Sequence, residues 1–171
     1  MHPVIIVYTG EGKGKTSACV GQAVRARGHG MTVAFAQFMK RPHQAGEQRF
    51  LAEFLGERFY AGGLGFLRRS EDFPAHRAAA QTTLAWAHAQ VDSGCRMLVL
   101  DEAVYALGYG LLERSELEAV LDSARAAACH VVLSGRGAPS WLVARAHIVT
   151  EMLPLRHAYA EGVAAQAGVE F

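Results

Sequence analysis

Short apolar runs alternate along the chain with longer stretches rich in helix-forming residues. The last of these stretches opens with Ser115 and places Glu118 three residues on, at the spacing of a capping box. Strands that alternate with helices predict an α/β fold, a mostly parallel sheet with helices on both faces. The apolar runs predict strands at 4–8, 32–38, 58–61, 97–100, 131–133 and 146–150, and the longer stretches predict helices at 16–27, 45–55, 73–93 and 115–127.

Length and composition place the chain among globular proteins. Its 171 residues suffice for a single domain, expected to span 1–171, and 51% hydrophobic with 19% charged residues argues against a disordered chain. The formal net charge of +1 gives no global basic field for a nucleic-acid partner. No apolar run approaches the roughly 20 residues that cross a bilayer, and no signal peptide is recognisable. Cys19, Cys95 and Cys129 form no C-x-x-C pair, so we expect a cytoplasmic protein that does not bind a membrane.

A glycine-rich loop follows the first predicted strand and opens the first predicted helix. It reads Thr9-Gly10-Glu11-Gly12-Lys13-Gly14-Lys15-Thr16. Glycines let backbone N–H groups surround a triphosphate, the lysine before the threonine supplies a positive charge, and a hydroxyl at the helix start can bind Mg²⁺. The usual pattern G-x-x-x-x-G-K-[ST] has a glycine where this chain has Thr9, but the Gly-Lys-Thr end is intact. The loop predicts ATP binding on a P-loop NTPase-like (RecA-like) fold.

Two further strand ends carry polar side chains. Asp101 and Glu102 follow the apolar run 97–100, where a Mg²⁺·ATP complex needs carboxylates, and either acid could bind the ion directly or through water. Arg136, flanked by glycines after the run 131–133, could neutralise a phosphate or hold a substrate carboxylate or amide. Because ligands of α/β folds bind beyond the carboxyl ends of the strands, we expect these groups to share one site with the phosphate loop.

Taken together, the strand-end segments resemble the P-loop ATP:corrinoid adenosyltransferases, which act on cobalamin or on cob(I)yrinic acid a,c-diamide. The resemblance covers essentially the whole chain in order, and only the phosphate loop is common to many families. Besides residues 9–16, the matching segments are Arg25–Gly30, Gln37–Lys40, Gly46-Glu47, Gly65-Phe66, Val99–Glu102 with Tyr105, Ser134–Gly137, His157–Tyr159, Gly162-Val163, Ala165-Gln166 and Gly168–Phe171.

The resemblance implies an enzyme that transfers the 5′-deoxyadenosyl group of ATP to the Co(I) of a corrinoid and releases triphosphate. Co(I) is a strong nucleophile that attacks the ribose C5′ carbon, so the protein must hold C5′ against cobalt and stabilise the leaving group. A sequence with a phosphate cradle and no evident nucleophile or catalytic dyad fits this division of work. The resemblance also implies that the nucleotide lies across the loop in the reverse of the usual orientation.

Site residues carried over from the family form three groups. Lys15, Thr16 and Glu102 are the expected catalytic residues, and Thr16 with Glu102, joined by Asp101, is expected to hold Mg²⁺. Phe66 is expected at the lower face of the corrin, where an apolar surface excludes a water ligand and eases reduction of cobalt. The full corrinoid set is Gln37, Lys40, Phe66, Tyr105 and Arg136, and the ATP set is Gly10, Glu11, Gly12, Lys13, Gly14, Lys15, Thr16, Ser17 and Arg25.

The resemblance further implies a homodimer and a flavoprotein electron donor, and the chain departs from the family in two places. Arg68 stands two residues after Phe66, where the family usually has a second aromatic residue, so the lower face is either arranged differently or completed by Leu64, Leu67 or another residue. Many members carry an N-terminal helical extension that covers a neighbouring subunit's site. This sequence opens at its first strand, and we expect no such cover.

Two other functions stay open on the sequence alone. A small P-loop kinase or nucleotide hydrolase would use the same loop and needs a group to orient an acceptor hydroxyl or water, which Asp101 or Glu102 could supply. A corrinoid carrier gated by ATP would bind both ligands without turnover. Consumption of ATP only in the presence of reduced corrinoid would separate an adenosyltransferase from both.

Overall fold

The computed structural model describes residues 2–170, without the side chain of Tyr159, and contains a six-stranded parallel sheet. The order across the sheet is β3-β2-β4-β5-β1-β6. The predicted α/β fold is confirmed, and all six predicted strands are present with ends shifted by no more than two residues. The strands are β1 (Ile5–Thr9), β2 (Val33–Gln37), β3 (Phe59–Ala61), β4 (Met97–Asp101), β5 (His130–Ser134) and β6 (Ile148–Glu151).

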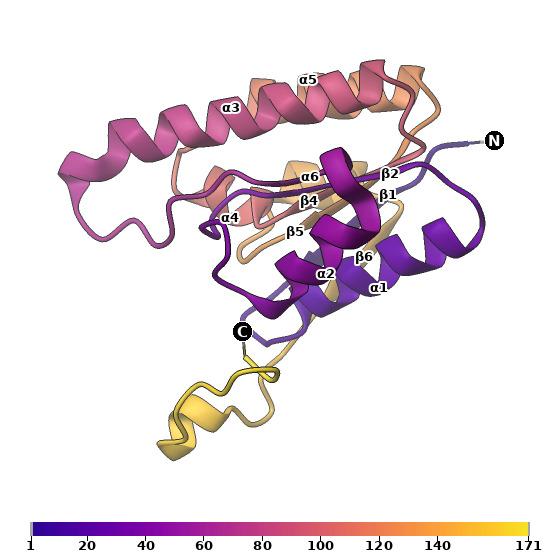
Figure 1. The fold of residues 1–171 in the computed structure, drawn as a ribbon. Helices are drawn as coiled ribbons and strands as arrows, with labels where there is room; N and C mark the ends of the chain where they lie inside the picture. The colour runs from indigo at the N-terminus through magenta and orange to yellow at the C-terminus, as the bar shows by residue number, and fades with distance from the viewer. Residues whose placement is uncertain (1, 171) are drawn as a thin grey trace.

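Helices cover both faces of this sheet (Figure 1). On one face lie α1 (Lys15–Gly28) and α2 (Gly46–Leu55), whose buried residues join one apolar cluster. The other face carries α3 (Phe73–Asp92), α4 (Ala103–Gly108), α5 (Arg114–Ala126) and α6 (Ser140–Arg145). Short 3₁₀ turns occupy Gly56–Arg58, Ser70–Asp72 and Ala158–Glu161. None of the helices between residues 2 and 170 combines the length and apolar character needed to span a bilayer.

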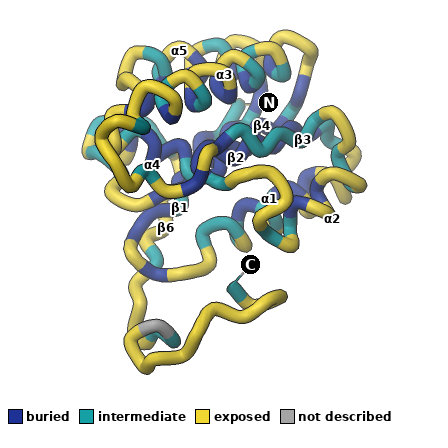
Figure 2. Tube along the Cα trace, turned by 60° about the vertical axis from the view of Figure 1, so that its left-hand side comes forward, coloured by how far each residue is buried: buried dark blue, intermediate teal, exposed yellow. Residues whose placement is uncertain are grey.

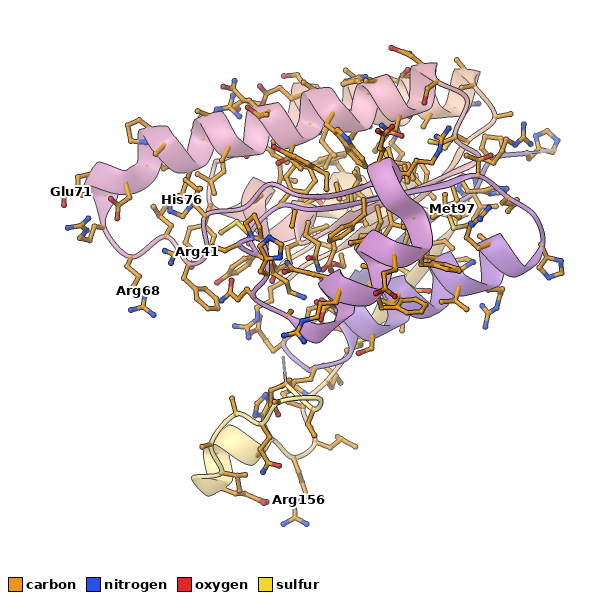
Figure 3. All side chains as sticks on the ribbon, in the orientation of Figure 1. Arg41, Arg68, Glu71, His76, Met97 and Arg156 are labelled. Carbon is orange, nitrogen blue, oxygen red and sulfur yellow. The ribbon has the colours of Figure 1, made fainter. Side chains whose placement is uncertain are left out.

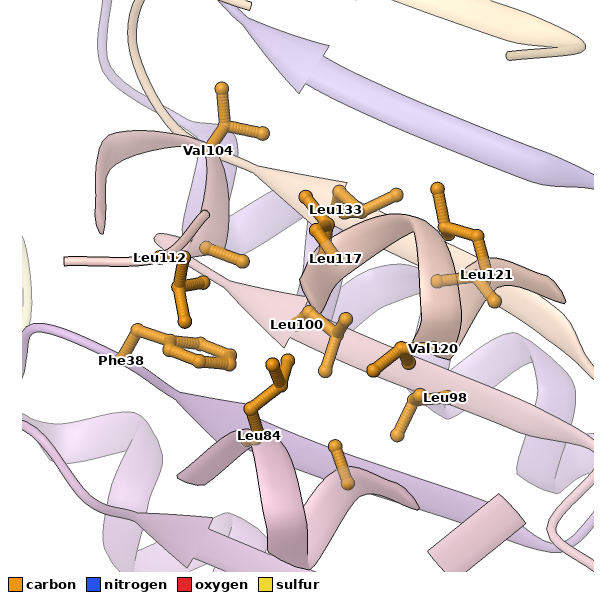
Figure 4. Packing of buried hydrophobic residues seen from close by; sticks show 14 of the residues in the cluster. Phe38, Leu84, Leu98, Leu100, Val104, Leu112, Leu117, Val120, Leu121 and Leu133 are labelled. Carbon is orange, nitrogen blue, oxygen red and sulfur yellow. The ribbon is translucent and has the colours of Figure 1, made fainter. Parts of the chain in front are cut away.

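The central strands are buried on both faces, which explains their unbroken apolar runs. In β4, Leu98 and Leu100 point into the cluster beneath α3 and α5, whereas Met97 and Val99 face α1. Figure 4 shows the first of these clusters, in which Leu84 lies between Phe38 and the strand leucines. This double packing fixes the carboxyl ends of the strands, and so the groups that they carry.

Two details of the helices differ from the sequence prediction. The helix α5 begins at Arg114, one residue before the predicted Ser115, and the N–H of Glu113 donates to the carboxylate of Glu116 at 2.7 Å. Glu116 has the required spacing and is also held by Arg77 of α3, so it takes the role predicted for Glu118. The helices α4 and α6 were not predicted, because six residues are too few to show a helical period.

The β6 end of the molecule is much more open than the centre. All four residues of β6 are exposed, and the segment 153–170 runs out from the sheet before it returns toward the start of α1 (Figures 1 and 2). Leu155 is 93% exposed. The segment contacts the phosphate loop at its far end, through an ion pair between Glu170 and Lys13.

Candidate functional site

The phosphate loop connects the end of β1 to the start of α1 in a conformation that requires glycine. Gly10 and Gly14 have φ values of +94° and +104°, where side chains are disfavoured. A Cβ on Gly12 would lie 2.7 Å from the carbonyl oxygen of Met152, which accepts a hydrogen bond from the Gly12 N–H. The loop leads into the N-terminus of α1, whose free N–H groups and dipole favour an anion.

The Lys15 ammonium lies folded back over this loop. It donates to the carbonyl oxygens of Gly10 and Gly12, at 2.6 Å each. Burial lowers the pKa of Lys15, and the nearby Arg136 lowers it further, while the acids around it act in the opposite direction. Both partners are neutral carbonyls, so a phosphate oxygen would replace them with a charged acceptor.

Asp101, the last residue of β4, is the centre of a buried hydrogen-bond network. Its side chain is fully buried and accepts hydrogen bonds on both oxygens. Ser134 donates at 2.6 Å, Gln37 at 3.0 Å, and Thr16 at 3.1 and 3.2 Å. Ser134 and Gln37 end β5 and β2, so strands on either side of β4 fix the carboxylate toward the first turn of α1.

Gln37 was expected to contact the corrinoid, and the structure does not place it where it could. Its side chain is 0% exposed and does not line the cavity described below. It donates to Asp101 and, at 3.2 Å, to Glu47, and it accepts from Gln48 at 2.8 Å. Since each of its polar atoms is already bonded inside the protein, Gln37 connects α2 to the Asp101 network.

Glu102 has the features of an incomplete ion site. Its backbone is left-handed, with φ of +63°, and its N–H donates to Ser134 at 2.9 Å. One carboxylate oxygen, Oε2, is buried without a hydrogen-bond partner. Burial and then the charge of Asp101 raise the pKa of Glu102 to about 7. A cation beside this oxygen would satisfy it and favour the ionised form.

The donor set fits magnesium bound together with a nucleotide. Hydroxyl and carboxylate oxygens are the ligands that Mg²⁺ accepts, and Thr16, Asp101 and Glu102 supply them. No group of three His, Cys, Asp or Glu side chains within residues 2–170 forms a cage for a metal ion. Phosphate oxygens and water would therefore have to complete the coordination, as is usual for Mg²⁺ in nucleotide sites.

The other cations of the site are each paired with an acid. Lys40 contacts Glu47 at 2.7 Å, Arg136 contacts Glu11 at 3.2 Å, and Lys13 contacts Glu170. Burial acts to lower the pKa of Lys40, but Asp101 and Glu47 more than offset it, so that pKa is raised. In each pair the acid neutralises the charge of the cation. A polyphosphate that binds in the site could replace the acids as the partners of these cations.

One cavity of about 1020 Å³ joins these groups to an apolar surface. Phe66, in the loop after β3, lies at its wall with 65% of its side chain exposed. Tyr105 of α4 lines it as well, with its hydroxyl 3.1 Å from that of Tyr109. Arg68 projects from the same loop into solvent (Figure 3). The lining comprises Glu11–Ser17, Val20, Lys40, Gly46, Glu47, Phe66, Glu102, Tyr105, Ser134–Arg136 and Gly168–Glu170.

The cavity gathers most, though not all, of the residues expected from the sequence. Arg25 lies outside it, on the exposed side of α1, ten residues or roughly 15 Å along the helix from Lys15. Sequence reasoning gave no role to Glu47, to Ser134 or to the far end of the C-terminal segment, all of which line the cavity. Glu47 and Ser134 stood within matching segments, and that was the one signal available for them.

A comparison with known protein families identifies the family to which this chain belongs. The family model described as ATP:corrinoid adenosyltransferase BtuR/CobO/CobP matches residues 1–171. The chain belongs to the ATP:corrinoid adenosyltransferase family. Corrinoid adenosyltransferases of Pseudomonas aeruginosa and Salmonella typhimurium are 40% and 37% identical to it, over 98% of this chain and 83% and 85% of theirs. The resemblance inferred from the strand-end segments is thereby confirmed.

Solved structures agree on the fold. The genome packaging NTPase B204 of Sulfolobus turreted icosahedral virus 2, solved in complex with AMP, is similar over 87% of this chain and 74% of its own, with a TM-score of 0.50 and 16% identity. At that identity the likeness concerns the P-loop α/β architecture alone.

Proposed function

We propose that this adenosyltransferase carries out its reaction in the 1020 Å³ cavity, with the triphosphate of ATP on the loop Gly10–Thr16 and the corrin against Phe66. The observation that carries the proposal is the presence of both surfaces in one cavity: a phosphate loop with its cations and an exposed aromatic ring. The family supplies the reaction, transfer of the 5′-deoxyadenosyl group from ATP to cobalt.

In this reaction the electron pair of Co(I) forms the bond to C5′, and the C5′–O5′ bond breaks with its electrons leaving on the triphosphate. No proton has to move to make the carbon–cobalt bond. The chain therefore has to hold two substrates in line and stabilise a polyanion. Lys15 would leave the loop carbonyls to contact the triphosphate, and Arg136 and Lys13 would exchange Glu11 and Glu170 for phosphate oxygens.

Thr16, Asp101 and Glu102 are the residues that would hold Mg²⁺, Asp101 through the position that Ser134 and Gln37 give it. When bound, Mg²⁺ supplies positive charge against the oxygens of the leaving triphosphate. The unpartnered Oε2 of Glu102 supports this assignment, because a buried carboxylate oxygen is otherwise costly to leave unpaired.

On the corrinoid side, Phe66 offers an apolar face that cannot donate a ligand to cobalt, and Tyr105 and Lys40 line the same cavity. An apolar lower face keeps water from the axial position and so eases reduction to Co(I). Since Arg68 points to solvent, we assign no part of this face to it. A flavoprotein reductant, a homodimer and a cytoplasmic location stay predictions from the sequence.

A P-loop kinase or hydrolase is the second candidate, and the Asp101 network argues against it. A general base must accept a proton from its acceptor, whereas Asp101 is fully buried and accepts from three side chains. Of the two acids that the sequence offers for that role, this leaves Glu102.

The test is an anaerobic assay of the purified protein with chemically reduced Co(I) corrinoid and Mg·ATP. We expect a light-sensitive adenosyl product and one triphosphate released for each product. Protein that binds ATP but forms no product from either cobalamin or its diamide precursor would refute the proposal. Binding of both ligands without turnover would favour a carrier, and phosphate release without corrinoid would favour a hydrolase.

A further inference from the structure

The ammonium of Lys40 lies among three oxygen-bearing side chains at the base of the cavity. It is 2.7 Å from Oε1 of Glu47, 3.0 Å from the hydroxyl of Thr16 and 3.5 Å from Oδ2 of Asp101. The Lys40 side chain is 22% exposed, so it is largely withdrawn from solvent. Its charge is thus held inside the cavity wall by oxygens from α1, α2 and β4.

Two of these oxygen donors are the ones assigned to magnesium above. The Thr16 hydroxyl and the Asp101 carboxylate face each other at 3.1 to 3.2 Å, and Lys40 Nζ lies within 3.5 Å of both. An ammonium and a divalent cation repel each other strongly at such separations inside a protein. Both cannot occupy this position at once.

The oxygens themselves stay in place whichever cation they hold. Asp101 is fixed by Ser134 and Gln37 independently of Lys40, and Thr16 is fixed by the first turn of α1. Lys40, in contrast, lies outside any helix or strand, and its ammonium is carried on a flexible aliphatic chain. Glu47 also lines the cavity, so Lys40 can keep this partner while it gives up the other two.

We propose that Lys40 is a resident counter-ion that occupies the magnesium position in the nucleotide-free protein and turns into the cavity when Mg·ATP binds. The inference rests on the proposed function, since it takes the Thr16–Asp101 position to be the magnesium site. The role of counter-ion is additional to the contact with corrinoid that the family resemblance implies for Lys40. The charge of Lys40 offsets the mutual repulsion of the carboxylates of Asp101, Glu47 and Glu102, which explains why a cation is built in at this position.

The experiment measures binding of Mn²⁺, a paramagnetic substitute for Mg²⁺, by electron paramagnetic resonance of the free ion in the absence of nucleotide. Lys40→Met removes the ammonium and keeps most of the stem, and we expect it to bind Mn²⁺ at least about tenfold more tightly than the unaltered protein. Lys13→Met is the matched control, because it removes an equal charge from the same cavity but from an ammonium paired with Glu170. We expect its Mn²⁺ affinity to change by less than about threefold, since its charge lies outside the oxygen cluster.

Equal Mn²⁺ affinity of Lys40→Met and the unaltered protein would overturn the inference, as would an equal gain in Lys13→Met. Lys40→Gln provides a second neutral variant with a polar end, should the methionine variant fail to fold. Equilibrium dialysis of the protein against Mn·ATP separates this inference from the proposed function, because ATP binds Mn²⁺ in solution and the resonance of the free ion would not then report binding to the protein. If ATP brings Mn²⁺ to the unaltered protein while Lys40→Met gains nothing without ATP, only the role of Lys40 is wrong. If no Mn²⁺ binds with ATP either, the magnesium site itself is wrong.

Discussion

The carboxyl ends of the parallel strands form one edge of the sheet. The centre of this edge and its two flanks hold their side chains in different ways. At the centre, Asp101, Ser134 and Gln37 are completely buried and joined by hydrogen bonds of 2.6 to 3.0 Å. At one flank Phe66 is 65% exposed, and at the other Leu155 is 93% exposed. The protein itself fixes the Asp101 carboxylate at the centre, whereas the flanks present apolar surface that the protein leaves uncovered.

In the proposed function this difference corresponds to the two substrates, with the triphosphate at the centre and the corrin at the Phe66 flank. The Asp101 network holds its oxygens in place before a triphosphate binds, and Lys15, Lys13 and Arg136 then exchange their present partners for phosphate oxygens. A corrin is a broad ring, and an exposed aromatic side chain can adjust to it while it excludes water. The comparison predicts that changes at the centre lower the rate of transfer, and changes at the Phe66 flank alter binding of the corrinoid.

Lys15→Ala should have the largest effect. The variant removes the ammonium that now donates to the carbonyl oxygens of Gly10 and Gly12 in the phosphate loop. We expect kcat to fall by roughly 10²–10³-fold, the usual cost of removing one group that stabilises a developing charge. Anaerobic spectroscopy of the Co(I) reaction measures it, and circular dichroism should show an unchanged fold. Normal activity would mean that the triphosphate binds elsewhere.

Gln37→Leu tests whether Gln37 belongs to the centre or to the corrinoid surface. Leucine would leave Asp101 and Gln48 without their shared partner, lowering the free energy of unfolding by about 2 kcal/mol. It should lower kcat about tenfold by releasing Asp101, with the KM for corrinoid unchanged. Urea unfolding and steady-state kinetics measure the two effects, with Gln22→Leu, at a partly exposed site on α1, as the control. A rise confined to the corrinoid KM would restore the original assignment.

The buried position of Gln37 shows where sequence reasoning stops. The strand–loop–helix context of residues 9–16 and the acids after 97–100 sufficed to predict the fold and the centre of the edge, because apolar runs and glycine spacing are local signals. Whether a polar residue at a strand end faces inward depends on its neighbour. Gln37 lies in register with Asp101 across β2 and β4, a pairing 64 residues apart that no local pattern reveals.

The same limit applies to Arg25 and to the C-terminal segment. Arg25 belongs to a matching segment, but helix geometry carries it away from the phosphate loop. Residues 153–170 have no period because they pack little against the core, and their one 3₁₀ turn is four residues long. Their far end contacts Lys13 through the ion pair of Glu170, a contact that sequence alone does not place.

Phe66→Ala should act on binding and leave the centre intact. Because the ring is mostly exposed, the free energy of unfolding should change little. Loss of its apolar surface should raise the KM for corrinoid by about tenfold with the KM for ATP unchanged. The matched control is Phe50→Ala, which removes a 48% exposed ring on α2 outside the cavity. Equal kinetic effects of the two variants would show that Phe66 is not part of a corrin surface.

Glu116→Gln should have the smallest effect and should leave the site unaffected. The carboxylate is bonded to Arg77 at 2.6 and 2.8 Å across α3 and α5, and this contact lowers the pKa of Glu116 from 4.5 to about 2. A pKa lowered in the folded state stabilises the fold above pH 4.5, and the contribution is lost as pH falls from 4.5 toward 2. Since the pair is partly exposed, we expect a loss of about 1 kcal/mol at pH 7.

Glutamine at this position can still accept from the N–H of Glu113, so the substitution isolates the charge from the helix cap. Urea unfolding at pH 7 and at pH 3 should show the difference between variant and unaltered protein shrinking with acid, with kcat unchanged throughout. Glu118→Gln, which weakens the pairs of Glu118 with Arg114 on α5 and, at 4.0 Å, with Arg145 on α6, should cost less at pH 7. A pH-independent loss in Glu116→Gln would mean that packing, not charge, joins the two helices. A fall in kcat would mean that the contact between α3 and α5 also affects the site around Asp101.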